Sequence, residues 1–218
     1  MSYKYSCAID LSCNFSSFAV SSENEIIFRY SKQLNGRSNT PFFEEFYSSL
    51  NKINIGISDI NRWIIGCGPG SFTGLRVASS FVKGVIFDKS VESCGISSAL
   101  PIAMKVKPLP CAKIAVLFFS AGKSIMMSTF LFKGGRFIAF DKPFVAEVND
   151  SLKFDIYDHV IFVSNANLLK LIGNIGLSES KLIVLDDFPV ELFLTEDWVD
   201  SKMDISDLIY IRPPSIGS

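Results

Sequence analysis

A glycine-rich segment is the part of this sequence whose residue types and spacing best suit chemistry. Residues 66–74 (GCGPGSFTG) follow the apolar run 62–66 and precede a helical pattern that begins at Leu75. Glycines allow sharp turns and let the backbone approach a ligand closely. The first turn of a helix offers unpaired N–H groups that suit an anion. The segment therefore predicts a strand, a loop and a helix N-terminus that together suit a phosphate or a carboxylate.

Neither of the common phosphate-binding patterns describes this segment. A Walker A loop needs a Lys after its glycines, and a dinucleotide-binding loop needs a third Gly where Thr73 stands. A second candidate, Gly122-Lys123-Ser124, has Leu117 at the position of the first Walker A glycine, and a strand-like run follows it. The sequence therefore contains no standard nucleotide-binding motif.

Arg76 is unusual for its position just after the glycines. A cation near the start of a helix opposes the helix dipole, so it needs a bound anion, a carboxylate partner or an exposed position. A salt bridge or solvent exposure explains Arg76 as well as a bound anion does. The residue types alone leave this choice open.

The histidine and cysteine contents exclude several kinds of catalytic site. The single histidine, His159, rules out a histidine pair on one metal within this chain and the H-E-x-x-H pattern of metallohydrolases. A Ser-His-Asp or Cys-His site would have to use His159, which lies beside the strand-like run Val160–Val163. The five cysteines include no C-x-x-C spacing, which favours free, reduced thiols over a zinc site or a disulfide framework.

The composition is that of a folded protein with little net charge. Hydrophobic residues make up 48% and charged residues 20%, which excludes wholesale disorder. The net charge of −1 argues against high-affinity nucleic-acid binding by the whole surface. The 20 phenylalanines suit either a core or a partner surface. Because the N-terminus lacks the pattern of a signal peptide and no apolar run approaches the roughly 20 residues of a membrane span, we expect a cytoplasmic protein.

The order of the predicted elements indicates two similar halves. Three short strands open the chain, a helix with aromatic residues follows, and the strand–loop–helix unit at 62–87 and a helix near 97–106 come next. After the proline-rich segment 107–110, a second set of strands begins with 113–119, 124–132 and 137–140. We therefore expect an α/β protein with an N-terminal domain at 1–106 and a C-terminal domain at 107–218.

The glycine-rich motif closely resembles a family signature. Residues 66–77 (GCGPGSFTGLRV) match the pattern G-x-G-P-G-S-F-T-G-x-R-[IV] of the bacterial TsaB (YeaZ) family. The opening residues 8–12 (AIDLS) are similar to the first strand of that family, which usually ends Asp-Thr-Ser. The order of elements agrees along nearly the whole chain, and the second half matches in pattern only. TsaB proteins are partners of TsaD in making threonylcarbamoyladenosine at position 37 of tRNA.

The resemblance implies a fold and a set of partners. The fold is of the ASKHA type found in sugar kinases, heat-shock proteins and actin, with two ribonuclease-H-like domains whose mixed sheets are flanked by helices. The implied role is a non-catalytic scaffold that docks TsaD, or a second copy of itself, through two helices of its N-terminal domain. A TsaE-like ATPase would bind the assembled pair, tRNA would be contacted only through the complex, and no membrane is involved. No cofactor would be bound firmly, but ATP or ADP could bind at the partner interface.

The resemblance also implies two groups of site residues, none of them catalytic or metal-binding. The expected partner interface consists of Phe43, Phe46, Tyr47, Leu50, Arg76, Ser79, Ser80 and Lys83. Small and aromatic helix faces suit a helix-bundle interface, although the same aromatic residues could instead cover the sheet of their own domain. The expected vestigial anion or nucleotide loop consists of Asp10, Ser12, Gly68, Gly70, Ser71 and Thr73.

Departures from the family pattern leave two further hypotheses to weigh. Residues 120–122 (SAG) stand where the family often has Asp-Ala-Arg, and Leu11 replaces a small polar residue, so nucleotide hydrolysis by this chain alone is not expected. The first alternative is an ATP-dependent ASKHA-fold kinase or ATPase, for which Asp10 is the best-placed carboxylate. The second is a glycoprotease-like peptidase, for which the sequence offers no nucleophile and base in a supporting context.

Overall fold

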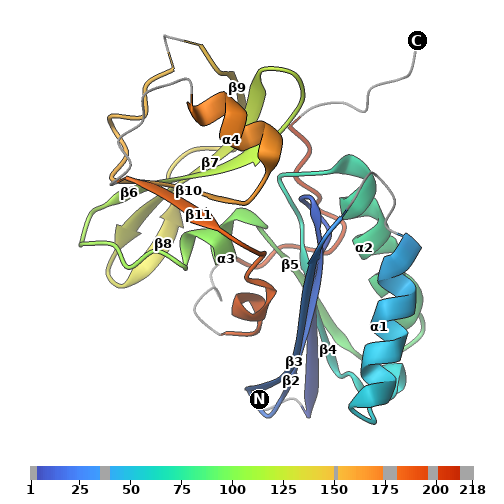
Figure 1. Ribbon diagram of the computed structural model, residues 1–218. Helices are drawn as coiled ribbons and strands as arrows, with labels where there is room; N and C mark the ends of the chain where they lie inside the picture. Colours follow the sequence, from blue (N-terminus) through green and yellow to red (C-terminus); the bar gives the residue numbers. More distant parts are fainter. Residues whose placement is uncertain (1–3, 35–39, 150–151, 174–180, 196–200, 212–218) are drawn as a thin grey trace.

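The computed structural model describes residues 4–34, 40–149, 152–173, 181–195 and 201–211. Two β-sheets form its framework, and each is flanked by helices (Figure 1). Within these ranges no helix is long and apolar enough to cross a membrane. The five cysteines are all free, as their spacing predicted.

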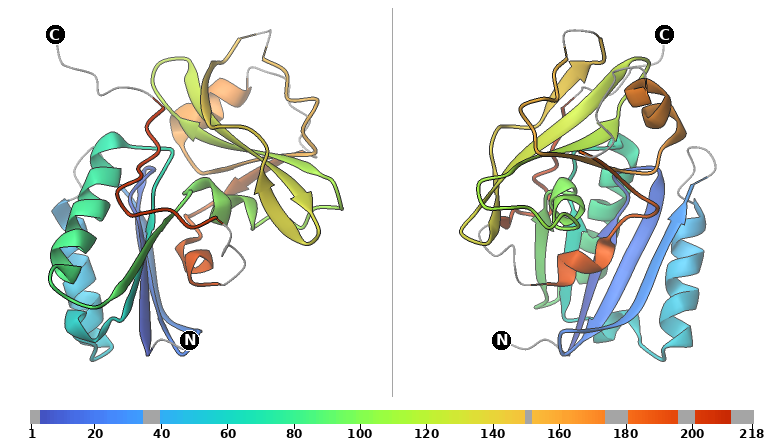
Figure 2. Two further views of the ribbon diagram at one scale, coloured as in Figure 1. Left: turned by 180° about the vertical axis from the view of Figure 1, so that it is seen from behind. Right: turned by 60° about the vertical axis from the view of Figure 1, so that its left-hand side comes forward.

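The first sheet belongs to the N-terminal half. Its strands are β1 (Tyr5–Asp10), β2 (Phe15–Ser22), β3 (Glu25–Gln33), β4 (Arg62–Gly66) and β5 (Glu92–Ile96). They lie in the order β3-β2-β1-β4-β5, in which β1, β2 and β3 form an antiparallel meander and β4 and β5 run parallel to β1. Helices α1 (Thr40–Lys52) and α2 (Phe72–Ile86) cover one face of this sheet, and the short η1 (Ile57–Asp59) leads from α1 to β4 (Figure 2).

The second sheet repeats this arrangement. Its strands are β6 (Lys113–Phe119), β7 (Ser124–Lys133), β8 (Arg136–Ala139), β9 (Phe144–Glu147), β10 (His159–Val163) and β11 (Leu182–Leu185). Read from the other edge, the order β8-β7-β6-β10-β11 corresponds strand by strand to β3-β2-β1-β4-β5 of the first sheet. Strands β6, β7 and β8 are antiparallel, and β10 and β11 run parallel to β6. Strand β9 is a third antiparallel partner of β7, after β6 and β8, and α4 (Ala166–Gly173) packs on this sheet.

The repeated strand order confirms the predicted fold class of two ribonuclease-H-like halves with mixed sheets and flanking helices, the ASKHA type. Three details differ from the sequence-based expectation. Strand β9 was not predicted, and α3 (Ala99–Ala103) is shorter than the expected helix at 97–106. Helix α2 begins at Phe72 rather than Leu75, because Ser71 provides an N-cap inside the glycine motif: its Oγ accepts a hydrogen bond from the N–H of Gly74 at 3.2 Å.

Aromatic side chains join α1 and α2 to the first sheet. Phe42 and Phe46 of α1 are buried, and both rings lie within 6 Å of the ring of Phe81 on α2, with centroid distances of 5.9 and 5.4 Å. Phe46 also packs edge-on against Phe18 of β2 at 5.0 Å. Edge-to-face contacts of this kind add to the stability gained by burying the rings. The helical spacing of these residues therefore serves the core of the N-terminal half first.

The opposite face of the first sheet is covered by the C-terminal part of the chain. Residues 188–194, which include the short η2 (Val190–Leu194), pack there with Phe188 and Phe193 fully buried. The same apolar cluster contains Ala8 and Ala19 of the first sheet and Ile161 of the second. One continuous core therefore joins the two halves.

Candidate functional site

The glycine loop lies where β4 ends and α2 begins, and its close contacts explain its glycines. A Cβ atom at Gly70 would overlap the carbonyl oxygen of Ser12, and one at Gly74 would overlap the carbonyl oxygen of Leu11. The N–H of Ser71 donates to the same Ser12 carbonyl at 2.6 Å. The loop that follows β1 therefore packs directly on the glycine loop, in the space that a side chain would need.

Gly68 is held from the other side by the turn that follows β5. Its N–H donates to Ser98 Oγ at 3.0 Å, and its carbonyl accepts from the N–H of Ser98 at 2.7 Å and from Ser97 Oγ at 3.2 Å. Its φ of 97° lies in the left-handed region, which favours glycine, and the Gly68–Pro69 peptide bond is cis. The N–H groups of Gly68, Ser71 and Gly74 therefore all donate to atoms of the chain itself.

Residues 203–211, which we call the C-terminal strap, cross the same region. Met203 forms a two-stranded bridge with Gly95 of β5, and Ile209 donates its N–H to the carbonyl of Cys67 at 2.7 Å. The hydroxyl of Ser79 on α2 donates to the carbonyl of Ile205 at 2.7 Å. The strap thus ties the glycine loop, β5 and α2 together at the carboxyl ends of the parallel strands, which is the edge where open α/β sheets commonly bind ligands.

The structure places the Asp10 carboxylate against this loop. Its Oδ1 accepts from the N–H of Ser12 at 2.8 Å and from Ser12 Oγ at 2.6 Å. The residue is fully buried, and this burial raises the pKa of the carboxyl to about 6, against the opposing effect of the Ser12 hydrogen bonds. Its Oδ2 lies where a side chain at Gly66 would have to go, and it has no hydrogen-bond partner among the described residues.

The structure therefore brings together Asp10, Ser12, Gly68, Gly70 and Ser71, and it leaves Thr73 exposed on α2. The N–H groups of Gly68, Ser71 and Gly74 already bind Ser98, Ser12 and Ser71, so these three donors are engaged within the chain. Among the described residues no group of three His, Cys, Asp or Glu side chains could hold a metal ion. The motif acts here as the junction of β1, β4, β5 and α2.

The expected partner-interface residues divide into two groups. Tyr47, Arg76, Ser80 and Lys83 are exposed, and Phe43 is half-buried. Phe46, Leu50 and Ser79 are buried, at 0%, 2% and 4% exposure, because they face the sheet, the neighbouring helix or the strap. In this structure these three side chains contact the chain itself, and their contact with a partner stays a prediction. A helix in contact with a sheet can offer a partner only its outward face.

The structure answers the question of how Arg76 is accommodated. Its side chain is exposed, and its guanidinium carbon lies 3.9 Å from the ring centroid of Phe72, one turn earlier on α2. Its Nε donates to the hydroxyl of Tyr210 at 3.3 Å, and the Tyr210 and Phe72 rings are 4.9 Å apart. Sequence reasoning missed Phe72 and Tyr210 here. Phe72 stands four residues before Arg76, which is contact spacing on a helix, but only the tertiary fold brings Tyr210 from the strap.

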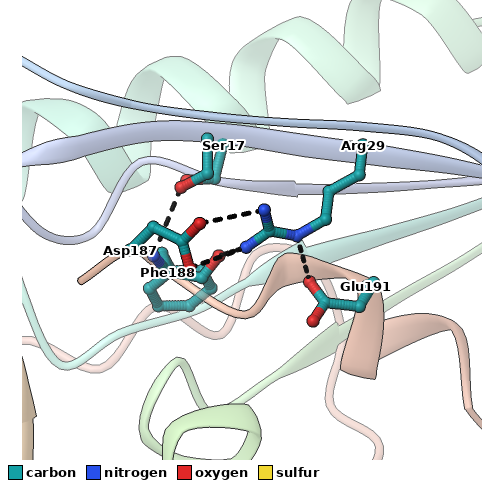
Figure 3. Close-up of polar contacts among 6 residues, drawn as sticks. Ser17, Arg29, Asp187, Phe188 and Glu191 are labelled. Atoms are coloured by element: carbon teal, nitrogen blue, oxygen red, sulfur yellow. Dashed lines mark hydrogen bonds and ion pairs between the residues drawn. The ribbon is translucent and has the colours of Figure 1, made fainter. Parts of the chain in front are cut away.

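A second polar cluster lies on the other side of the first sheet, between the two halves (Figure 3). Arg29 of β3 binds both carboxylate oxygens of Asp187, donates to Glu191 at 2.6 Å and donates to the carbonyl of Phe188 at 3.1 Å. The N–H of Phe188 also donates to Ser31 Oγ at 3.2 Å. Burial lowers the pKa of Arg29, but its hydrogen bonds and charge pairing with Asp187 and Glu191 outweigh this and raise it.

His159 does not form a catalytic pair in the described part of the chain. It begins β10 opposite Ile114, and its Nδ1 is buried without a hydrogen-bond partner. A general base needs a hydrogen bond to its nucleophile or a short path to it. This position does not favour a peptidase, and the apolar core that joins the two halves does not favour a kinase that closes on a substrate between them.

Comparisons with known proteins agree with the motif and the fold. The family model for TsaD, tRNA N6-adenosine threonylcarbamoyltransferase, matches residues 44–151, about half of the chain. YeaZ from Pseudomonas aeruginosa has the same fold, with a TM-score of 0.72 and 15% identity over 98% of this chain and 100% of that one. The resemblance to the TsaB (YeaZ) family is confirmed. A further structure from Pseudomonas aeruginosa, described as an uncharacterized protein with similarity to peptidase YEAZ, has a TM-score of 0.74 and 15% identity, covering 97% of this chain and 100% of that one.

No curated protein matches the chain. At 15% identity, the likeness to YeaZ establishes the fold of this chain, and its role needs an argument from its own surface. The TsaD family match begins within α1 and continues through the glycine loop, α2 and the start of the second half. The region that the TsaD family model matches thus includes most of the two helices that lie on the outside of the first sheet (Figure 1).

Proposed function

We propose that this chain is a non-catalytic subunit of the complex that makes threonylcarbamoyladenosine at position 37 of tRNA, and that it docks a TsaD-like catalytic subunit through α1 and α2. The proposal places the protein in the cytoplasm, with tRNA bound through the complex. It includes a TsaE-like ATPase that binds the assembled pair and ATP or ADP at the partner interface. A second copy of the chain is the competing occupant of the same helices.

One observation carries the proposal: α1 and α2 have outward faces that their own sheet does not use. On α2 the exposed residues recur at helical spacing, namely Thr73, Arg76, Ser80, Lys83 and Gly84. On α1, Tyr47 is 47% exposed although its neighbour Phe46 is fully buried. Aromatic, arginine and small residues on a helix face suit a packed helix interface. The TsaD family match supports the same region, since it covers most of both helices.

The contacts of the glycine loop support a structural role rather than catalysis. The N–H groups of Gly68, Ser71 and Gly74 bind serine oxygens of the chain, and Asp10 is covered by Gly66 and Ser12. An anion that used these three donors would have to displace their present contacts. The loop fixes the start of α2, so the part of the motif that resembles a phosphate site supports the orientation of the docking helix.

The test is co-purification with TsaD of the same organism, with and without ATP. Ser80→Arg places a long charged side chain at the centre of the exposed face of α2, and we expect it to weaken the complex at least tenfold. Ala139→Arg, at an exposed position of β8 in the other half, is the matched control and should leave binding unchanged. Substitutions at Phe46 or Ser79 would not be informative, because both side chains are buried and their loss would disturb folding.

Absence of a complex with the wild-type chain, with or without nucleotide, would refute the proposed function. A complex that Ser80→Arg leaves intact would place the interface elsewhere on the molecule. Circular dichroism of each variant before the binding measurement separates a lost interface from a lost fold.

A further inference from the structure

The outward face of α2 carries positive charge without any negative charge. The helix sequence (FTGLRVASSFVKGVI) contains Arg76 and Lys83 but no Asp or Glu. Both cations are exposed, and the small residues Ser80 and Gly84 lie on the same face between and beside them. Phe87, directly after the helix, is 80% exposed. This face therefore combines two cations, a close-approach region and an apolar end.

Arg76 is held in place without an acidic partner. Its guanidinium stacks on Phe72 and its Nε donates to Tyr210, so two aromatic side chains fix its position. Among the described residues no carboxylate lies within 4.0 Å of it. Arg76 is the fifth residue of α2 and lies beyond its first turn, so the helix dipole does not explain its position. An oriented arginine on aromatic rings is typical of residues that contribute most to a protein interface.

Lys83 differs from Arg76 because the strap partly compensates its charge. It contributes to lowering the pKa of Asp204 in the strap, after the larger contribution of the hydrogen bonds from Ser206. Arg76 is therefore the cation of α2 whose charge the chain leaves least satisfied.

The charge pattern separates the two candidate occupants of this face. If a second copy placed its α2 here, Arg76 and Lys83 would face the same cations, which is unfavourable. The α2 of a second copy offers no carboxylate, and the exposed carboxylates near its docking surface lie on α1 (Glu44), after α2 (Asp88) and on the strap (Asp204 and Asp207). A partner helix that carries carboxylates opposite α2 has no such conflict. Ser80 and Gly84 allow that helix to approach closely, which favours a protein helix over a nucleic acid.

We infer that Arg76, fixed by Phe72 and Tyr210, is the anchor of the docking surface and binds a carboxylate on an acidic helix of a different protein. This inference rests on the proposed docking through α1 and α2, and it names the chemistry of the partner. It also extends the docking surface from the two helices to the C-terminal strap. The strap holds the buried side of α2 through the hydrogen bond of Ser79 with Ile205. It also places Tyr210 beside Arg76 on the exposed side of the helix.

The experiment measures the dissociation constant of the complex with TsaD for the wild-type chain and for four variants. We expect Arg76→Glu to weaken binding more than tenfold and Arg76→Lys to weaken it several-fold, since Lys keeps the charge but not the planar stack. Tyr210→Phe should weaken it about two-fold. Lys133→Glu, an equal charge reversal at an exposed site in the other half, should have no effect. Because Arg76 is exposed and Glu is a good helix former, Arg76→Glu should fold normally.

Salt dependence and self-association complete the test. Raising the salt concentration from 50 to 500 mM should weaken the wild-type complex and leave the Arg76→Glu complex, if it is detected, nearly unchanged. A wild-type complex that Arg76→Glu weakens less than two-fold would overturn this inference and leave the proposed function intact. Failure of the wild-type chain to bind TsaD would remove the proposed function itself. Two further outcomes would assign Arg76 to another occupant and overturn the inference. One is a wild-type homodimer that both Glu44→Lys and Arg76→Glu dissociate. The other is binding of tRNA by the isolated chain that Arg76→Glu abolishes.

Discussion

Arg29 and Asp187, which are 158 residues apart in the sequence, form a hydrogen bond at 2.9 Å and an ion pair at 2.8 Å that connect β3 of the first half to the segment before η2 (Figure 3). Arg29 also donates to Glu191 and to the carbonyl of Phe188, so it joins three residues of the C-terminal segment to β3. The neighbouring Phe188 and Phe193 are buried in the core that joins the two halves. The polar junction therefore lies at the edge of an apolar contact, where it fixes the register of the C-terminal segment on the first sheet.

The first prediction concerns this junction. Arg29→Gln should lower the free energy of unfolding by about 1–3 kcal/mol, because it leaves Asp187 and Glu191 without their shared cation. The side chain of Arg29 is 32% exposed, so water will screen part of the loss, and the effect should shrink in high salt. Urea denaturation at low and high salt measures it. Lys32→Gln, at an exposed position on the same strand, should change the free energy of unfolding by less than about 0.5 kcal/mol. An equal loss in both variants would contradict the stabilising role assigned to the contacts of Arg29 with Asp187 and Glu191.

The second prediction concerns the pH dependence that Asp10 causes. Burial raises the pKa of this carboxyl from 3.8 to about 6, so the folded state holds the proton more tightly than the unfolded state. The contribution of Asp10 to the stability of the fold is thus most favourable below about pH 4 and is lost as the pH rises through 6. From well below pH 4 to well above pH 6, the free energy of unfolding of the wild-type chain should fall by on the order of 3 kcal/mol relative to that of Asp10→Asn.

Parallel denaturation curves of both proteins from pH 4 to 7 measure this difference, since other titrating groups cancel. Asp204→Asn is the control of opposite sign. The pKa of Asp204 is lowered from 3.8 by hydrogen bonds from Ser206, so the wild-type chain should gain stability over that variant as the pH rises toward about 4, and the curves for this control start below that pH. A wild-type to Asp10→Asn difference that does not change with pH would show that Asp10 keeps an ordinary pKa.

The third prediction separates core from surface on α1. Phe46→Ala should lower the free energy of unfolding by about 3–5 kcal/mol, because a fully buried ring is replaced by a cavity. Tyr47→Ala should lower it by less than about 1 kcal/mol, because its ring is nearly half exposed. Tyr47→Ala is then the variant to use for partner binding. Similar losses of stability in both variants would mean that α1 packs with a different face toward the sheet.

The fourth prediction concerns two glycines of the same helix. Gly74→Ala should be strongly destabilising, because its Cβ would overlap the Leu11 carbonyl and separate the loop after β1 from α2. Gly84→Ala should stabilise the chain by about 0.5–1 kcal/mol, because no atom lies within 4 Å of the new methyl group and alanine favours helix. Thermal unfolding of both variants tests this. A tolerated Gly74→Ala would mean that the glycine motif is not the junction described here.

The sequence predicted the architecture well because hydrophobic periodicity is a local property. Alternating and helical patterns indicated most of the strands and α2, and the repeated order of strands indicated two similar halves. It did not indicate β9, whose four residues carry too short a pattern. It also treated the aromatic residues of α1 as one group, because spacing alone does not say which helix face meets the sheet.

The sequence by itself determined the fold class, the glycine motif and the absence of a histidine pair, since each depends on residue type and short-range spacing. The tertiary structure alone decided that Phe46, Leu50 and Ser79 are buried while Ser80 and Lys83 are exposed, because burial depends on what packs against a helix. It also decided the contacts of Arg29 with Asp187 and of Arg76 with Tyr210. These pairs are separated by more than a hundred residues, and only the return of the chain end to the first sheet brings them together.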